Sequence, residues 1–243
     1  MNVNSCSVSF TCLIFIALLG HGKQPAATVT SDKGNIVYVS ADGLITRLTN
    51  SGRDREPALH PDGEWIYFIR SFEGRFVEET YILPTGKQDP SGKMLQEELW
   101  RVRRNGTESH RLYQDDIAGP CPNAEHEVAS LGNIQFSPDG ALIYFELDRW
   151  TTSSELWVVD KDGKNRHALG FGNGTRIVQE STLGKYRGFI VTSQHRYFVF
   201  GGSYDWYYLF TPDMKKMIGA IGESIEKGTN SNFITFVPTH RSD

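Results

Sequence analysis

The sequence predicts an all-β fold, a small β-propeller of about four blades, in which each blade is a four-stranded antiparallel sheet. One observation is an internal repeat, because residues 56–68 (EPALHPDGEWIYF) return as residues 133–145 (NIQFSPDGALIYF). Each copy is followed by a second matching piece, residues 99–106 in the first and 156–163 in the second. Aromatic residues form 12% of the chain and 24 residues are glycine, which suits short strands joined by tight turns. Repeated β units bury their apolar faces by stacking on neighbours, and radial closure leaves few exposed strand edges.

Each repeat is expected to hold four strands, named a to d in chain order. Pro-Asp-Gly joins a to b, because proline presets φ and glycine accepts a positive φ. The b strands are apolar on both faces, as in a strand buried between layers. Asn-Gly or Asp-Gly joins c to d as a hairpin turn. The expected strands a to d are residues 57–60, 65–70, 98–103 and 111–112 in the first repeat, and 133–137, 142–148, 155–160 and 168–169 in the second.

A third repeat is less regular than the other two. Residues 194–196 (QHR) are expected to replace the Pro-Asp-Gly turn between strands a and b. The strands a to d of this repeat are predicted at residues 189–193, 197–200, 206–210 and 216–221.

The two ends of the chain predict a composite blade that closes the ring. Residues 36–43 and 46–49 match a c–d pair, and residues 28–30 are the candidate for its strand b. Near the other end, residues 232–238 (NFITFVP) match the strand a of residues 133–138. The alternative is an open, partial propeller that dimerises.

The N-terminal residues are typical of a secretory signal. Residues 10–20 (FTCLIFIALLG) form an apolar run that is shorter than the about 20 residues of a transmembrane helix. We expect a signal peptide over residues 1–22, with cleavage as late as residue 27, although its first residues carry no Lys or Arg. The domain then spans residues 28–243, with no transmembrane segment and one cysteine, Cys121, expected to be a passive thiol.

In its turns and strands the chain resembles the TolB-like propeller repeat family. The shared order is Arg-Leu-Thr at residues 47–49, Glu-Pro at 56–57, Pro-Asp-Gly at 61–63 and an apolar strand at 66–68. Ser-Pro-Asp-Gly at residues 137–140 is a second match, and His60 stands where the family has serine. The resemblance implies a secreted, usually periplasmic, propeller. The chain has no room for the extra N-terminal domain of TolB itself, so that protein's role is not carried over.

Unequal connections predict where binding residues lie. The a–b and c–d connections are tight, whereas four b–c and d–a connections are expected to be long: residues 71–97, 114–131, 149–154 and 171–187. The long connections would then lie on one face of the propeller and the short ones on the opposite face. Binding residues concentrate on long loops held by a rigid scaffold, so we expect them on the long-loop face. The candidate partner-binding residues are Arg75, Trp150, Tyr204, Asp205 and Trp206. Trp206 is the weakest of these candidates, because its place in strand c favours burial in the core.

Known catalytic and metal motifs are not matched. Residues 201–205 (GGSYD) lack the last glycine and the strand–turn–helix context of a nucleophile elbow. An acidic loop, with Asp-Asp at 115–116 and Glu-His-Glu at 125–127, follows no ligand spacing. We therefore expect no catalytic residue, no metal site and no cofactor.

These observations favour a non-enzymatic scaffold that binds a protein or polysaccharide of the cell envelope. The net charge of −4, with no Lys/Arg stripe, argues against nucleic acid as a partner. The alternative is a small carbohydrate-active hydrolase or lyase with a metal at the channel mouth.

Overall fold

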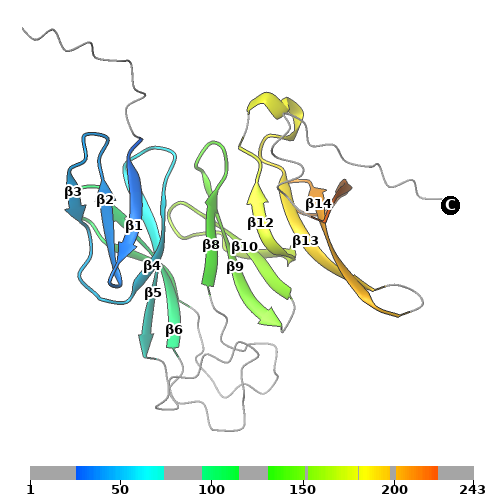
Figure 1. Cartoon of the computed structure of the whole chain (residues 1–243), viewed down its shortest axis with the longest axis horizontal. Helices are drawn as coiled ribbons and strands as arrows, with labels where there is room; N and C mark the ends of the chain where they lie inside the picture. Colours follow the sequence, from blue (N-terminus) through cyan, green and yellow to red (C-terminus); the bar gives the residue numbers. More distant parts are fainter. Residues whose placement is uncertain are drawn as a thin grey trace, which may run out of the picture.

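The computed structural model describes residues 26–73, 95–114, 131–150, 153–179, 181–197 and 201–223, and these form four antiparallel sheets (Figure 1). In each sheet the strands follow one another in chain order. The first sheet has β1 (Thr28–Asp32), β2 (Asn35–Val39) and β3 (Ile45–Arg47). The second has β4 (Asp54–Leu59), β5 (Trp65–Glu73), β6 (Leu95–Arg103) and β7 (His110–Gln114). The third has β8 (Leu131–Phe136), β9 (Leu142–Trp150), β10 (Ser153–Asp160) and β11 (His167–Phe171). The fourth has β12 (Asn173–Ile177), β13 (Ile190–Tyr197), β14 (Ser203–Phe210) and β15 (Met217–Gly222), with a 3-10 helix η2 (Ser181–Tyr186) between β12 and β13.

This arrangement is that of a small four-bladed β-propeller, as the repeat predicts. The sheets succeed one another across Figure 1 as blades, and the first strands of the blades, β4, β8 and β12, lie beside one another. In the first blade, β1 pairs with β2 and β2 with β3, which confirms the expected strands at that end of the chain. Residues 232–238, expected to complete this blade, lie outside the described residues, as do the signal region 1–22, Cys121 and the acidic loop.

The b strands are apolar on both faces because each serves two cores. On β5, Ile66 and Phe68 pack against the first blade, whereas Tyr67 and Ile69 pack against the third. On β9, Tyr144 faces the fourth blade while its neighbours Ile143 and Phe145 face the second. Alternation of side chains along a strand produces this division. The continuous apolar runs in the sequence of β5 and β9 therefore indicate that each strand is packed between two neighbouring blades.

The innermost strands β4, β8 and β12 share a β-bulge with a left-handed residue. These residues are Glu56, Asn133 and Gly174, with φ of 48°, 54° and 56°. A bulge re-aims the neighbouring side chains. Here they form bonds between blades: Asn133 Nδ2 donates to the Thr175 carbonyl at 2.7 Å, and the Gln135 side-chain carbonyl accepts the Ile177 amide at 2.8 Å.

His60, the departure from the Ser-Pro-Asp-Gly turn, joins two blades. Its side chain is 5% exposed, and Nε2 lies 2.8 Å from the Gly140 carbonyl oxygen, in the equivalent turn of the third blade. The ring also packs edge-on against Phe136, with 5.0 Å between centroids. By contrast, Ser137 in the third blade hydrogen-bonds to Asp139 and Leu142 of its own turn. His60 keeps a local contact as well, because its Nδ1 accepts the Asp62 amide at 3.3 Å, so the histidine adds a contact between blades to the bond within its turn.

Replacing His60 with serine, the residue of the other turn, is expected to lower the free energy of unfolding by about 1–3 kcal/mol. The variant loses the bond to Gly140 and leaves unfilled space beside Phe136. Denaturant unfolding measures the change. The control is His167→Ser, because His167 is exposed and bonds only within its turn, so its effect should stay within about 0.5 kcal/mol. Equal unfolding midpoints for the two variants would contradict this role of His60.

The fourth blade corrects the prediction for the third repeat. Residues 194–196 do not form a turn, because they lie inside β13, paired with β14. Strand a of this blade is β12 and strand b is β13, so the sequence prediction placed strand a one strand too late. The physical reason is that Gln194, His195 and Arg196 each keep a partner across the ladder, which holds these polar residues in the strand.

Two of the four connections expected to be long are short. Residues 151–152 alone join β9 to β10, and Gly172 alone joins β11 to β12. In the fourth blade the long connection instead joins strands a and b, over residues 178–189, and carries η2. The prediction of one elaborated and one trimmed face is therefore wrong for this blade. The connections at residues 74–94 and 115–130 lie outside the described residues.

Candidate binding site on the fourth blade

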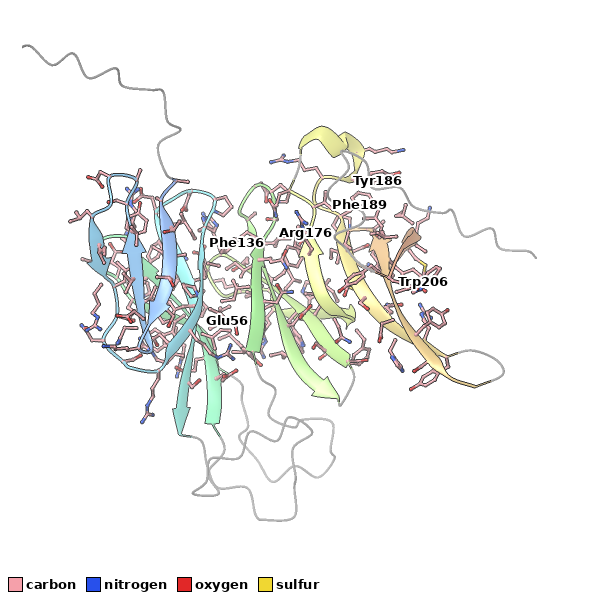
Figure 2. All side chains as sticks on the ribbon, viewed as in Figure 1. Glu56, Phe136, Arg176, Tyr186, Phe189 and Trp206 are labelled. Carbon is pink, nitrogen blue, oxygen red and sulfur yellow. The ribbon has the colours of Figure 1, made fainter. Side chains whose placement is uncertain are left out.

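The hairpin of β13 and β14 carries the candidate site. Its register pairs Gln194 with Trp206, His195 with Asp205, and Arg196 with Tyr204. Because side chains alternate along strands, these pairs divide between the two faces of the sheet. One face carries Gln194, Arg196, Tyr204 and Trp206, and the other carries His195, Tyr197 and Asp205. Figure 2 shows Trp206 on this hairpin at the far side of the fourth blade.

The face with Arg196 is directed to the third blade. Arg196 donates to the side-chain oxygen of Gln194, and Gln194 Nε2 donates to the Phe171 carbonyl of β11 at 3.3 Å. The Arg196 guanidinium also lies 5.4 Å from the ring centroid of Tyr208, which is buried in the core between these blades. Burial raises the pKa of Tyr208, and Tyr204 beside it adds to this effect. Tyr208 is therefore uncharged, so it contacts the Arg196 guanidinium without neutralising its positive charge.

The opposite face holds the contact of His195 with Asp205 and the exposed ring of Tyr197. His195 Nδ1 lies 3.0 Å from Asp205 Oδ1, and the ring of Tyr197 packs edge-on against His195 at 4.9 Å. Tyr197 is 76% exposed. Across the strand, Trp206 is 37% exposed and packs against Tyr204 at 5.8 Å. Both faces therefore present aromatic rings beside polar groups.

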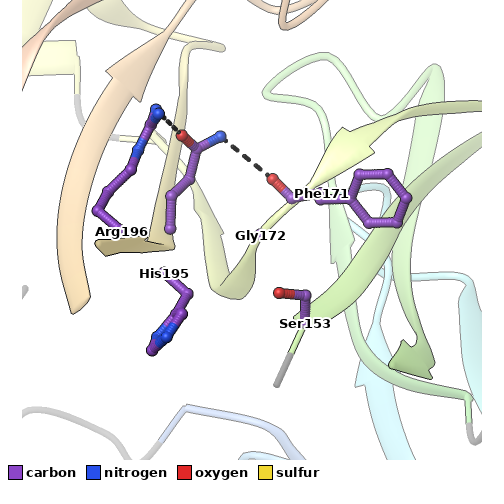
Figure 3. Close-up of a pocket in the computed structure, with 6 residues that line it drawn as sticks. Ser153, Phe171, Gly172, His195 and Arg196 are labelled. Atoms are coloured by element: carbon purple, nitrogen blue, oxygen red, sulfur yellow. Dashed lines mark hydrogen bonds between the residues drawn. The ribbon is translucent and has the colours of Figure 1, made fainter. Parts of the chain in front are cut away.

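A cavity of about 210 Å³ lies where this hairpin meets the third blade (Figure 3). Figure 3 shows Arg196 on one side of it and Ser153 on the other. Arg196 donates to Gln194, which in turn donates to the Phe171 carbonyl. No carboxylate among the described residues lies within ion-pair distance of Arg196. The residues that line the cavity are Ser153, Phe171, Gly172, Gln194, His195 and Arg196.

The arrangement is not that of an assembled nucleophilic centre. The His195–Asp205 pair resembles the base and orienting carboxylate of a catalytic triad, and Ser153 lines the same cavity. Within the described part of the chain, however, no hydrogen bond joins Ser153 to His195. In the same residues, no group of three His, Cys, Asp or Glu is placed to hold a metal ion.

Four of the five predicted site residues converge on this region. Tyr204, Asp205 and Trp206 lie on β14, and Trp150 ends β9 directly across the ladder from Ser153. Arg75 lies outside the described residues. Trp206 is exposed rather than buried in the core, although it does lie in strand c. Arg196 is not among the predicted site residues, because the sequence predicts a turn at residues 194–196 where the structure has the strand β13.

Comparisons with known proteins define no family. No protein-family model matches the chain, and no curated protein matches it in sequence. Solved structures do match. A puromycin hydrolase is 13% identical with a TM-score of 0.45, over 76% of this chain and 27% of that one. The β-propeller domain of the Trilobed protease from Pyrococcus furiosus is 11% identical with a TM-score of 0.43, over 75% and 49%. TolB from Acinetobacter baumannii is 14% identical with a TM-score of 0.37, over 82% and 52%.

The chain spans between about a quarter and a half of the length of these proteins. The assignment of a propeller fold rests on the sheets of the chain itself. In the described residues, no helix is long and apolar enough to cross a membrane.

Proposed function

We propose that this chain is a non-enzymatic β-propeller of the TolB-like kind that binds a protein or glycan of the cell envelope through the β13–β14 hairpin. The observation that carries the proposal is the hairpin's combination of exposed aromatic rings, charged groups and a cavity. We further propose that residues 1–22 act as a signal peptide and that the mature domain is periplasmic or secreted.

Rigidity at the base of the hairpin supports a binding role. Ile190, Tyr208 and Phe210 are buried against the third blade, so the ends of both strands are fixed by the core. Tyr204 and Trp206 lie further along the same strand, where their rings reach solvent. Tyr and Trp contribute large contact areas at a low cost in side-chain entropy, and they are enriched at binding hot spots. A platform held in this way needs little reorganisation on binding.

The chemistry of the cavity favours binding over turnover. His195 bonds to Asp205, and no hydrogen bond joins it to Ser153 in the described residues, so His195 is not placed as a base for that hydroxyl. The polar groups that line the cavity are fixed donors and acceptors, which serve to orient a ligand.

The double variant Tyr204→Ser/Trp206→Ala is expected to weaken binding to immobilised envelope extract at least about tenfold, because anchor residues contribute most of the binding energy. Surface plasmon resonance with purified protein measures the change. The control is Leu44→Ser/Ile45→Ser, which removes apolar side chains that are 65% and 68% exposed on the first blade. Equal binding by both double variants would argue against the hairpin as the binding surface.

A further inference from the structure

The geometry of the cavity assigns it a ligand class that the proposed function leaves open. We propose that the cavity binds a carboxylate of an acidic polysaccharide, a chain that contains uronic acids. This inference rests on the proposed binding function and adds the chemistry of the ligand. The observation behind it is an arginine that lines a cavity without an acidic partner in the described residues.

Arg196 is held so that its donors remain available. One amino group, Nη2, donates to Gln194, whose own amide is fixed by the Phe171 carbonyl. A guanidinium has five N–H donors in a rigid plane. Arg196 uses donors on Gln194 and on the Tyr208 side chain, and the remaining donors can bind a ligand. Two parallel N–H groups of the planar guanidinium can donate to the two oxygens of one carboxylate, which gives a bidentate pair. The Ser153 hydroxyl, across the cavity, adds a neutral donor.

Nearby charges do not oppose a bound anion at this place. Asp205 lies on the other face of β14 from Arg196 and is already paired with His195 at 3.0 Å. Tyr208, under the guanidinium, is neutral because its pKa is raised. Among the residues that line the cavity, Arg196 thus presents a permanent positive charge to an incoming group.

The size of the cavity limits what enters it. Its volume of about 210 Å³ is below the roughly 300–1,000 Å³ of sites for drug-sized ligands. It therefore accepts one small group, such as a single sugar acid, while the rest of the ligand lies along the surface. Phe171, 50% exposed, and Trp206, 37% exposed, provide apolar rings beside it for the C–H faces of further sugars.

The side chains of the hairpin favour a glycan. In the described ladders, β12 pairs with β13 only as far as Ser193, and β15 pairs with β14 only from Tyr207 onward. The outer residues of the hairpin are therefore paired with each other, and the cavity beside them is reached by side chains. These side chains are aromatic rings, a guanidinium and an amide, which suit the C–H faces and polar groups of sugars.

Isothermal titration calorimetry tests the inference with two probes, a mannuronate oligosaccharide and a neutral manno-oligosaccharide of the same length and linkage. We expect the mannuronate to bind at least about tenfold more tightly, a difference of about 1.4 kcal/mol in binding free energy.

Variants of the cavity test which residues bind the carboxylate. Arg196→Gln should reduce the affinity for the mannuronate to that for the neutral probe. Arg196→Lys should lie between, because it keeps the charge but loses the planar fork. Ser153→Ala should weaken binding severalfold. The control is Arg47→Gln, an exposed arginine on the first blade, which should bind as the unaltered protein does.

Each outcome decides the inference. Equal affinity for the two probes, no binding of either, or unchanged binding by Arg196→Gln and Ser153→Ala would overturn it. Tighter binding of a polyglutamate peptide that depends on Arg196 would assign the cavity to an acidic protein instead. If Trp206→Ala abolishes mannuronate binding while Arg196→Gln does not, the hairpin remains the binding surface and only the carboxylate assignment fails. Melting temperatures of all variants confirm that each is folded.

Discussion

Replacing Arg55 with alanine is expected to lower the free energy of unfolding by about 3–5 kcal/mol. Arg55 Nη2 lies 2.7 Å from both carboxylate oxygens of Glu97, and it also donates to the Leu131 carbonyl at 2.6 Å. Glu97 in turn accepts the Leu131 amide at 2.7 Å. The Glu97 side chain is only 8% exposed, so loss of Arg55 removes the guanidinium that lies 2.7 Å from a buried carboxylate. The pair also joins the second blade to the third, so its loss weakens their interface.

Chemical denaturation measures this effect against a matched surface pair. Arg104 and Glu64 are also paired, but their side chains are 45% and 52% exposed. Arg104→Ala should therefore cost less than about 1 kcal/mol, because exposed ion pairs contribute little. The double variant Arg55→Met/Glu97→Met should be less destabilised than Arg55→Ala, because it removes both charges of the pair together. Similar losses for Arg55→Ala and Arg104→Ala would show that the buried pair is not important for stability.

A single methyl group at Gly172 is expected to destabilise the fourth blade by about 1–3 kcal/mol or more. An added Cβ would lie 2.1 Å from Thr192 Oγ1 and 2.8 Å from Thr192 Cγ2, well inside contact distance. Thr192 is fully buried, so neither residue can move without a shift of β11 against β13. Gly172 also lines the cavity, so Gly172→Ala should weaken ligand binding together with stability.

The matched control for Gly172→Ala is Gly132→Ala. Its Cβ would meet only Glu56 Oε2 at 3.6 Å, an ordinary contact. We expect a change within about 0.5 kcal/mol there. Adding Thr192→Ala to Gly172→Ala should recover part of the loss, because it removes the two closest atoms. Thermal unfolding of the three variants measures these differences, and a Gly172→Ala protein as stable as Gly132→Ala would refute the packing described at this junction.

The sequence predicted most of the second and third blades because their signals are local. Pro-Asp-Gly turns at residues 61–63 and 138–140 join β4 to β5 and β8 to β9, as expected. Runs that are apolar on both faces became β5 and β9, buried between neighbouring blades. In the fourth blade the turn motif is absent, and polar residues at 194–196 were interpreted as its replacement. Their partners on β14 keep them in the strand, and this pairing is not visible in the local sequence.

The candidate site was predicted in part for the same reason. Aromatic residues such as Tyr204 and Trp206 can be recognised as candidates from their type and position in the sequence alone. The cavity depends on how closely two blades approach, through contacts such as that of Gln194 with Phe171. Those residues lie far apart in sequence and match no motif. Arg196 and Ser153 therefore became candidates only from the packed structure.

Photo-crosslinking in cells tests most directly whether the β13–β14 hairpin is the binding surface. A photoreactive residue replaces Trp206 in one variant and Lys164, on the exposed turn after β10, in another. The proposed function predicts a covalent adduct, protein or glycan, from position 206 and none from position 164. Adducts of the same kind from both positions, or from neither, would contradict it.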